Sequence, residues 1–221
     1  MMRPETLSLG LEEPARAAGT TRLGPAAVVL TAFAQSFATE LLTGICGICR
    51  RSPLRHMLTP GGWKMSVAMT NCGEAGWVAD RTGYRYDRID PETATAWPAM
   101  PASLRAFATA AAAEAGFAGF IPDACLINQY HPGARLSLHQ DRNEEDLTAP
   151  IVSVSLGLPA VFLWGGHKRA DRSVRVPLMH GDVVVWGGVD RLRFHGVHSL
   201  GDGTHPQTGA VRYNLTFRKA R

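Results

Sequence analysis

The runs CLINQY (125–130), ARLSLH (134–139), IVSVSLG (151–157), AVFLWG (160–165), SVRVPL (173–178), DVVVWGG (182–188), RLRFHGV (191–197) and AVRYNLTFR (210–218) follow one another in the second half of the chain. Each run is short and rich in β-branched or aromatic residues, and Pro, Gly or Asp separates it from the next. Short strands at such regular spacing are typical of two antiparallel sheets packed face to face. Residues 123–221 are therefore predicted to form a double-stranded β-helix, or jelly roll.

Residues 21–122 have a different pattern, which makes the predicted fold class α+β. Apolar residues at helical spacing, followed by two arginines and a proline, predict a helix over residues 37–51. A second helix is expected over residues 101–114, with Gly116 as its C-terminal cap. Between the two, residues 58–90 are rich in Gly, Trp, Tyr and Thr, which favours short strands and a lid.

The composition suits one soluble domain without a secretion or membrane signal. Residues 1–20 lack the apolar core of a signal peptide and are expected to be a flexible arm ahead of one domain over residues 21–221. The apolar stretch 25–48 is interrupted by polar residues and is too polar to span a bilayer. Four cysteines are too few and too scattered for a secreted disulfide scaffold, so we expect a cytoplasmic protein, and a monomer. Cys46 and Cys49 have redox or zinc-like spacing, but they lie on an apolar helical pattern and are expected to be buried thiols.

His139-Gln140-Asp141 and the distant His195 form a candidate metal site. Residues two apart on an extended segment point to the same face, so His139 and Asp141 can bind one metal ion, and His195 can provide the third ligand. Two imidazoles and one carboxylate leave three octahedral positions open, as in non-haem Fe(II) oxygenases. The other histidines are expected to be surface or hydrogen-bonded residues. The acidic residues 144–146 are expected to be solvated in a loop.

Alternation along residues 212–218 predicts a polar cavity. In RYNLTFR the even-numbered positions are polar or cationic and the odd ones apolar, so one face enters a cavity while the other packs. A guanidinium can bind a carboxylate in bidentate form. Arg212 is therefore the candidate for the far carboxylate of an acidic co-substrate.

Several longer segments resemble the AlkB family of DNA-repair dioxygenases. They are TPGGWKMSVAMTNCG (59–73), DPETATAWPAMP (90–101), PDACLINQY (122–130), PGARLSLHQD (132–141), APIVSVSLGLPAVF (149–162), HGDVVVWGG (180–188) and RYNLTFR (212–218). These motifs are long and collectively specific, and the resemblance covers nearly all of residues 21–221. It implies an enzyme that uses Fe(II), O2 and 2-oxoglutarate to oxidise N-alkyl groups on bases such as 1-methyladenine and 3-methylcytosine, releasing aldehyde, succinate and CO2.

The resemblance also assigns residues to the two halves of the site. It implies that Arg218 lies near the keto-acid end of 2-oxoglutarate. The residues implied to line the co-substrate pocket are Leu126, Asn128, Gln129, Tyr130, Leu136, Arg212, Asn214 and Arg218. It implies that Trp77 stacks on one face of the damaged base and that His195 borders the other. The other residues implied to lie near the nucleotide are Thr59, Trp63, Met69, Tyr84, Arg85, Tyr86, Asn143 and Arg169.

Two positions depart from the family pattern. Trp63 stands where the relatives often carry Tyr, which removes a hydroxyl that could reach a phosphate. Asn143 stands where they carry an Asp aimed at the exocyclic nitrogen of the base. Because an amide offers the hydrogen bond without the charge, discrimination in favour of cationic bases is expected to be weaker here.

The expected partner is alkylated DNA, single-stranded by preference, with RNA as a further candidate. A net charge of +4 and a pI near 9.1 are compatible with a polyanion. Two alternatives stay open: the same chemistry on a protein, lipid or small molecule, and a non-enzymatic jelly roll with a structural metal. The aromatic and basic content of residues 58–90 favours a nucleotide, and a structural site would not need Arg212.

Overall fold

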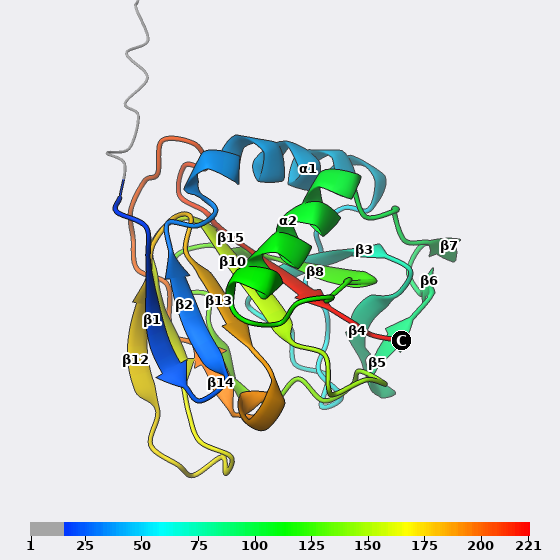
Figure 1. Cartoon of the computed structure of the whole chain (residues 1–221). Helices are drawn as coiled ribbons and strands as arrows, with labels where there is room; N and C mark the ends of the chain where they lie inside the picture. Colours follow the sequence, from blue (N-terminus) through cyan, green and yellow to red (C-terminus); the bar gives the residue numbers. More distant parts are fainter. Residues whose placement is uncertain (1–15) are drawn as a thin grey trace, which may run out of the picture.

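Two antiparallel sheets form the centre of the molecule (Figure 1). The computed structural model describes residues 16–221. The larger sheet has the strand order β1 (Gly19–Gly24), β2 (Ala27–Thr31), β13 (Val183–Trp186), β10 (Ile151–Gly157), β15 (Arg212–Arg218), β8 (Ala124–Tyr130) and β3 (Ala68–Gly73). The smaller sheet has the order β12 (Val174–Leu178), β11 (Ala160–Trp164), β14 (His195–Val197) and β9 (Leu136–His139).

The eight strands from β8 to β15 make the jelly roll that the sequence predicts. Four of them lie in the larger sheet and four in the smaller one, and all their pairings are antiparallel. Each of the eight predicted runs overlaps one of these strands. The predicted jelly roll is therefore confirmed.

The run RLRFHGV differs from the prediction, because only its last three residues form a strand. Its first part continues a turn after the 3-10 helix η2 (Gly188–Asp190). Arg191 is drawn into the interior there, 2% exposed, and donates to the Asp141 carbonyl oxygen at 2.6 Å. His195 therefore begins a strand, whereas the predicted run places it near the end of one.

Two helices cover the outer face of the larger sheet (Figure 1). They are α1 (Ala38–Arg51), which follows the 3-10 turn η1 (Gln35–Phe37), and α2 (Ala102–Glu114). Their apolar faces share one core with the odd-numbered side chains of β15, Leu215 and Phe217. Among the residues that the structure describes, no helix is long and apolar enough to cross a membrane.

The strands ahead of α1 were not predicted. β1 and β2 extend the larger sheet through the pairing of β2 with β13. β1 begins at Gly19, inside the predicted arm, and Arg16 ahead of it pairs with buried Asp182 at 2.8 Å. The rest of the predicted arm, residues 1–15, lies outside the described residues.

Residues 58–90 contain the short strands that their composition favours. β3 lies at the edge of the larger sheet, whereas β4 (Gly76–Asp80) and β5 (Gly83–Asp87) form a separate hairpin. We call this pair of strands the β4–β5 hairpin. A short pair, β6 (Ile89–Asp90) and β7 (Thr95–Ala96), follows it.

The four cysteines are free thiols in different environments. Cys72 and Cys125 are buried opposite each other on β3 and β8. Cys49 is half-buried, and burial raises its pKa to about 11. Cys46 is exposed on α1, so the expectation of a buried thiol is wrong at that position.

Candidate active site

One cavity contains most of the predicted site residues. Its volume is about 570 Å³, and the inner faces of both sheets and the β4–β5 hairpin line it. The predicted residues found in its wall are Thr59, Met69, Trp77, Tyr84, Leu126, Asn128, Tyr130, Leu136, His139, Asp141, Asn143, Arg169, His195, Arg212, Asn214 and Arg218.

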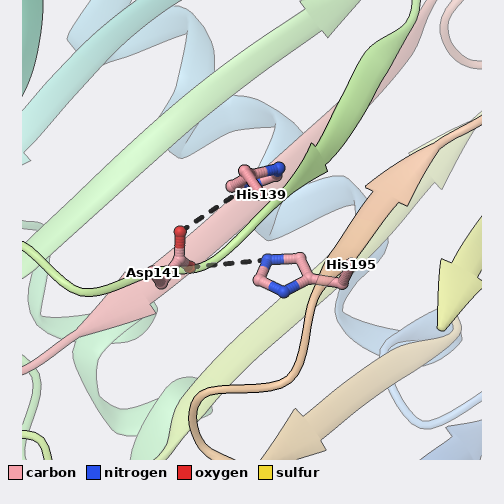
Figure 2. A group of neighbouring side chains, drawn as sticks. All are labelled: His139, Asp141 and His195. Atoms are coloured by element: carbon pink, nitrogen blue, oxygen red, sulfur yellow. Dashed lines mark ion pairs between the residues drawn. The ribbon is translucent and has the colours of Figure 1, made fainter. Parts of the chain in front are cut away.

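The three predicted metal ligands meet at the ends of two paired strands (Figure 2). His139 and His195 are direct partners across the β9–β14 pair, and Asp141 follows His139 by two residues. The Asp141 carboxylate oxygens lie 3.6 Å from His139 Nε2 and 3.8 Å from His195 Nε2. All three candidate donor atoms lie within 4.8 Å of one another, so a single metal ion can contact all of them.

Hydrogen bonds to main-chain carbonyls orient both imidazoles. His139 Nδ1 lies 2.9 Å from the Ser137 carbonyl oxygen, and His195 Nδ1 lies 3.0 Å from that of Arg193. Because a carbonyl oxygen only accepts, each Nδ1 carries the proton and each Nε2 keeps its lone pair for a metal. Burial lowers the pKa of His195 to about 3, with His139 acting in the same direction, so His195 is neutral at physiological pH.

Arg218 holds the carboxylate of Asp141. Its Nη2 and Nε donate to Asp141 Oδ2 at 2.7 and 3.0 Å, and both side chains are buried. Burial alone would raise the pKa of Asp141, but Arg218 and the two histidines outweigh it and hold the pKa well below its usual value. The carboxylate is therefore ionised, as a metal ligand must be.

Arg212 lies at the end of β15 opposite to Arg218, and it does not use all of its hydrogen-bond donors. It is 1% exposed, its Nη2 donates to Ser155 Oγ at 2.9 Å, and its guanidinium lies over the Tyr130 ring. Among the described residues, its Nε and Nη1 have no hydrogen-bond partner. Leaving buried charged donors unpaired is costly, so this end of the cavity favours a carboxylate ligand.

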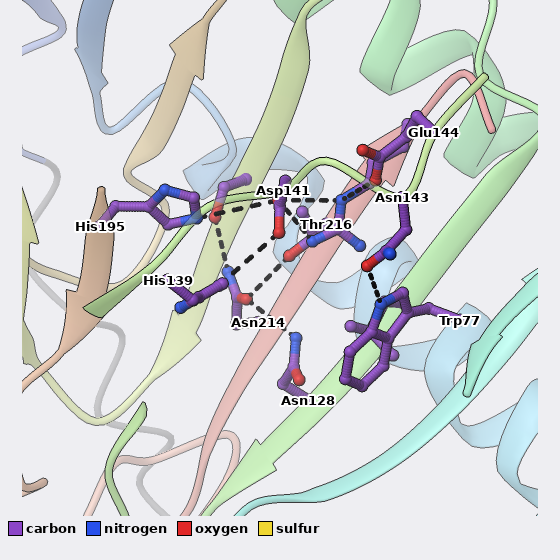
Figure 3. A network of polar contacts seen from close by, with 12 residues as sticks. Trp77, Asn128, His139, Asp141, Asn143, Glu144, His195, Asn214 and Thr216 are labelled. Carbon is purple, nitrogen blue, oxygen red and sulfur yellow. Dashed lines mark hydrogen bonds and ion pairs between the residues drawn. The ribbon is translucent and has the colours of Figure 1, made fainter. Parts of the chain in front are cut away.

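Amide and hydroxyl side chains, among them Asn128, Asn214 and Thr216, lie beside the metal cluster (Figure 3). Asn214 Nδ2 donates to Ser153 Oγ at 2.8 Å, and Asn214 Oδ1 accepts from Asn128 Nδ2 at 3.2 Å. The neighbouring Leu215 packs on the opposite side, against the helices. The polar and apolar faces of β15 are thus arranged as the alternation predicted.

Two stacked aromatic rings on the β4–β5 hairpin form another part of the wall. The Trp77 and Tyr84 ring centroids are 5.5 Å apart, with 14° between the ring planes. We call this pair the aromatic platform. Asn143 accepts a hydrogen bond from Trp77 Nε1 at 3.2 Å (Figure 3), and its Nδ2 lies 3.4 Å from the Tyr84 carbonyl oxygen. Both ends of the Asn143 amide therefore contact the hairpin.

Four residues implied by the resemblance are not in the cavity wall: Trp63, Arg85, Tyr86 and Gln129. Gln129 points to the other face of β8 because side chains alternate along a strand, and it donates to Tyr213 Oη. Arg85 is turned away from its two tyrosine neighbours for the same reason and pairs with Asp80 at 2.8 Å. Trp63 is 79% exposed in the loop before β3.

Tyr86, the fourth, contacts Glu144 instead. Its hydroxyl donates to Glu144 Oε1 at 2.7 Å. Glu144 is only 6% exposed, and its carboxylate pairs with Arg191 at 3.0 Å and Arg218 at 3.4 Å. The prediction that residues 144–146 are solvated is therefore wrong for Glu144, because two buried guanidinium groups take the place of water.

Several cavity residues were not identified from the sequence: Ser153, Phe162, Trp186 and Thr216. A signal existed for Ser153, because the serines at positions 153 and 155 of IVSVSLG alternate with apolar residues and mark the face turned away from the apolar core. Trp186 packs edge-on against His195 with 4.9 Å between ring centroids. No sequence signal distinguishes such a tryptophan from an ordinary core residue.

Comparisons with known proteins agree with this geometry. The 2OG-Fe(II) oxygenase superfamily profile matches residues 27–218. Alpha-ketoglutarate-dependent dioxygenase AlkB of Salmonella typhimurium is 58% identical over 198 residues, which cover 90% of this chain and 92% of the relative. This chain belongs to the AlkB family of that superfamily. Its Escherichia coli relative of the same name is 57% identical, again over 90% of this chain and 92% of the relative.

A solved structure of OsALKBH1 has a similar fold. That structure is 27% identical, with a TM-score of 0.78, and the match covers 91% of this chain and all of the other. As a member of this family, the chain is a dioxygenase that uses Fe(II), 2-oxoglutarate and O2. The residues present suit both cofactors: neutral imidazoles and one carboxylate suit Fe(II), and the unpaired donors of Arg212 suit a dicarboxylate.

Proposed function

We propose that this enzyme oxidatively removes alkyl groups from N-alkylated nucleobases in DNA, such as 1-methyladenine and 3-methylcytosine. The reaction uses Fe(II), O2 and 2-oxoglutarate and releases aldehyde, succinate and CO2. One observation carries the proposal: a single cavity is lined by a three-residue metal cluster, a buried guanidinium with unpaired donors, and an aromatic platform.

In this proposal His139, Asp141 and His195 hold Fe(II), while Arg212 binds the far carboxylate of 2-oxoglutarate. Fe(II) and 2-oxoglutarate together supply the activation of O2 that oxidises the alkyl carbon. Arg218 keeps Asp141 ionised and oriented. The protein positions the carbon and excludes water, and no side chain has to act as a general acid or base in the hydrogen abstraction.

The aromatic platform is proposed to hold the alkylated base. Trp77 would stack on one face of the base with His195 at the other, and Thr59, Met69 and Arg169 line the same cavity. An enzyme that acts on a base must take it out of the stack, which costs least in a single strand. We therefore expect single-stranded DNA to be preferred, with RNA as a second substrate.

The enzyme is further proposed to work as a monomer in the cytoplasm. The free thiols of all four cysteines suit a reducing compartment.

Succinate formation with different acceptors tests the proposed substrate class. The enzyme with Fe(II) and labelled 2-oxoglutarate would be given a 1-methyladenine oligonucleotide as a single strand, as a duplex and as RNA, and also a methylated peptide. We expect the methylated nucleic acids to stimulate succinate formation, and single-stranded DNA to do so most strongly. An unmethylated oligonucleotide, included as a control, should not stimulate it. Stimulation by the peptide alone would instead support the alternative of a protein-directed oxygenase.

Asn143→Asp tests whether residue 143 senses the charge of the base. The substitution adds a negative charge at a partly solvated position of the cavity wall, so we expect turnover of cationic 3-methylcytosine to rise roughly two- to fivefold relative to neutral 1-methylguanine. It also removes the amide hydrogen facing the Tyr84 carbonyl, so the Michaelis constants for both lesions should increase. Asn143→Ala is the matched control, because it loses the hairpin contacts without gaining charge. An unchanged lesion ratio in Asn143→Asp would mean that residue 143 does not face the base.

A further inference from the structure

A series of polar contacts connects the β4–β5 hairpin with the carboxylate of the metal cluster. It starts at Tyr86, whose hydroxyl donates to Glu144 Oε1 at 2.7 Å. The same Glu144 oxygen lies 3.4 Å from Arg218 Nε, and Arg218 donates to Asp141 Oδ2 at 2.7 Å. Figure 3 shows Asp141 and Glu144 on one loop, with the hairpin residue Trp77 beside it.

The other oxygen of Glu144 holds a second arginine that acts on the same loop. Arg191 Nη2 donates to Glu144 Oε2 at 3.0 Å, and Arg191 Nη1 donates to the Asp141 main-chain carbonyl at 2.6 Å. One carboxylate therefore fixes two guanidinium groups, one holding the side chain of Asp141 and the other its backbone. Glu144, Arg191, Arg218 and Asp141 are all at least nine-tenths buried.

Tyr86 is directly connected to the aromatic platform. It is the register partner of Trp77 across the β4–β5 hairpin, so the two residues move together with the hairpin backbone. Burial raises the pKa of Tyr86 well above its usual value, and the hydroxyl therefore keeps the proton that it donates. Tyr86 lines no part of the cavity, so this contact is separate from any contact with the base.

We propose that Tyr86 and Glu144 are positioning residues that couple nucleotide docking on the β4–β5 hairpin to metal binding at Asp141. The proposal rests on the proposed function, because it takes the hairpin as the element on which the nucleotide docks. A base held by the aromatic platform restrains the hairpin and keeps the Tyr86 hydroxyl on Glu144. Glu144 then holds both arginines, and Asp141 loses less freedom when the metal binds.

The coupling has a definite sign. Because docking orders part of the metal site in advance, an oligonucleotide should tighten metal binding, and the metal should tighten oligonucleotide binding by the same factor. The contacts of Glu144 with Tyr86, Arg191 and Arg218 could instead serve only the stability of the fold. In that case, removing the Tyr86 hydroxyl should lower the unfolding temperature and leave the factor by which the oligonucleotide tightens metal binding unchanged.

The test measures the Mn(II) dissociation constant of the full chain by electron paramagnetic resonance, with and without a single-stranded 1-methyladenine oligonucleotide. Mn(II) is a probe that accepts the same imidazole and carboxylate donors. Tyr86→Phe removes only the hydroxyl. Tyr213→Phe is the matched control, because it removes a tyrosine hydroxyl that contacts Gln129 on the other side of the larger sheet.

We expect the oligonucleotide to tighten Mn(II) binding to the wild type and to Tyr213→Phe by roughly fivefold or more. In Tyr86→Phe the factor should fall below about twofold. Glu144→Gln should lose the coupling as well, and it should also weaken Mn(II) binding on its own because the amide no longer holds the two arginines.

The outcomes separate this inference from the proposed function. A wild type that binds the oligonucleotide but shows no change in Mn(II) affinity would overturn the coupling alone, as would a Tyr86→Phe variant with the full factor. A wild type that does not bind the methylated oligonucleotide at any Mn(II) concentration would overturn both.

Discussion

Asp141→Ala is expected to abolish metal binding and all turnover of 2-oxoglutarate, including turnover without a nucleic acid. Two imidazoles alone bind iron more weakly and no longer present a facial set of three donors. The substitution also leaves the buried guanidinium of Arg218 without its closest partner, so positive charge is uncompensated beside the metal site. Metal content after dialysis and succinate release in the absence of oligonucleotide measure the two effects.

Two further variants make the result specific. Asp141→Asn keeps the shape of the side chain and should lose metal binding while the protein remains folded by circular dichroism. His198→Ala changes an exposed histidine whose Nδ1 lies 3.3 Å from the Ser199 carbonyl oxygen, and it should retain activity. Wild-type activity in Asp141→Ala would contradict the assignment of the metal ligands.

Arg212→Lys is expected to weaken 2-oxoglutarate binding by about 1.5–3 kcal/mol, the range for hydrogen bonds to charged groups. Lysine keeps the positive charge but cannot provide the separate Nε and Nη donors that are unpaired in this structure. A loss of that size raises the dissociation constant roughly ten- to hundredfold. Isothermal titration with 2-oxoglutarate under anaerobic conditions, with Mn(II) in the metal site, measures it directly.

The metal affinity provides the internal control for Arg212→Lys. Arg212 and Arg218 lie at opposite ends of β15, so the Mn(II) dissociation constant in the absence of 2-oxoglutarate should hardly change. An unchanged affinity for 2-oxoglutarate would place its far carboxylate elsewhere in the cavity. A large loss of Mn(II) affinity would instead indicate that the substitution disturbs the fold of β15.

The parts of this protein that depend on local sequence were predicted well. Strand alternation is a property of neighbouring residues, so the jelly-roll strands and the inward face of β15 followed from the sequence. The proximity of His139 and Asp141 followed from the same rule. The pairing of β9 with β14 brings His195 to them, and alternation alone could not predict that pairing.

The parts that depend on contacts between distant segments were missed. β2 belongs to the larger sheet because it pairs with β13, more than a hundred residues later, and no nearby residue signals that pairing. Glu144 has the composition of a solvated loop, yet Arg191 and Arg218 bury it from two other elements. Gln129 was implied by resemblance as a cavity residue, although its neighbours Asn128 and Tyr130 take the inward positions of β8.

The most direct measurement is the stoichiometry of base repair in one reaction. A single-stranded oligonucleotide with one 1-methyladenine would be incubated with the enzyme, Fe(II), O2 and labelled 2-oxoglutarate, and succinate, formaldehyde and the oligonucleotide mass would be followed together. Oxidative dealkylation predicts that the three change in step: each succinate formed is matched by one formaldehyde and by one oligonucleotide that has lost its methyl group. Succinate formation with an unchanged oligonucleotide mass, at enzyme concentrations that exceed the oligonucleotide, would contradict the account.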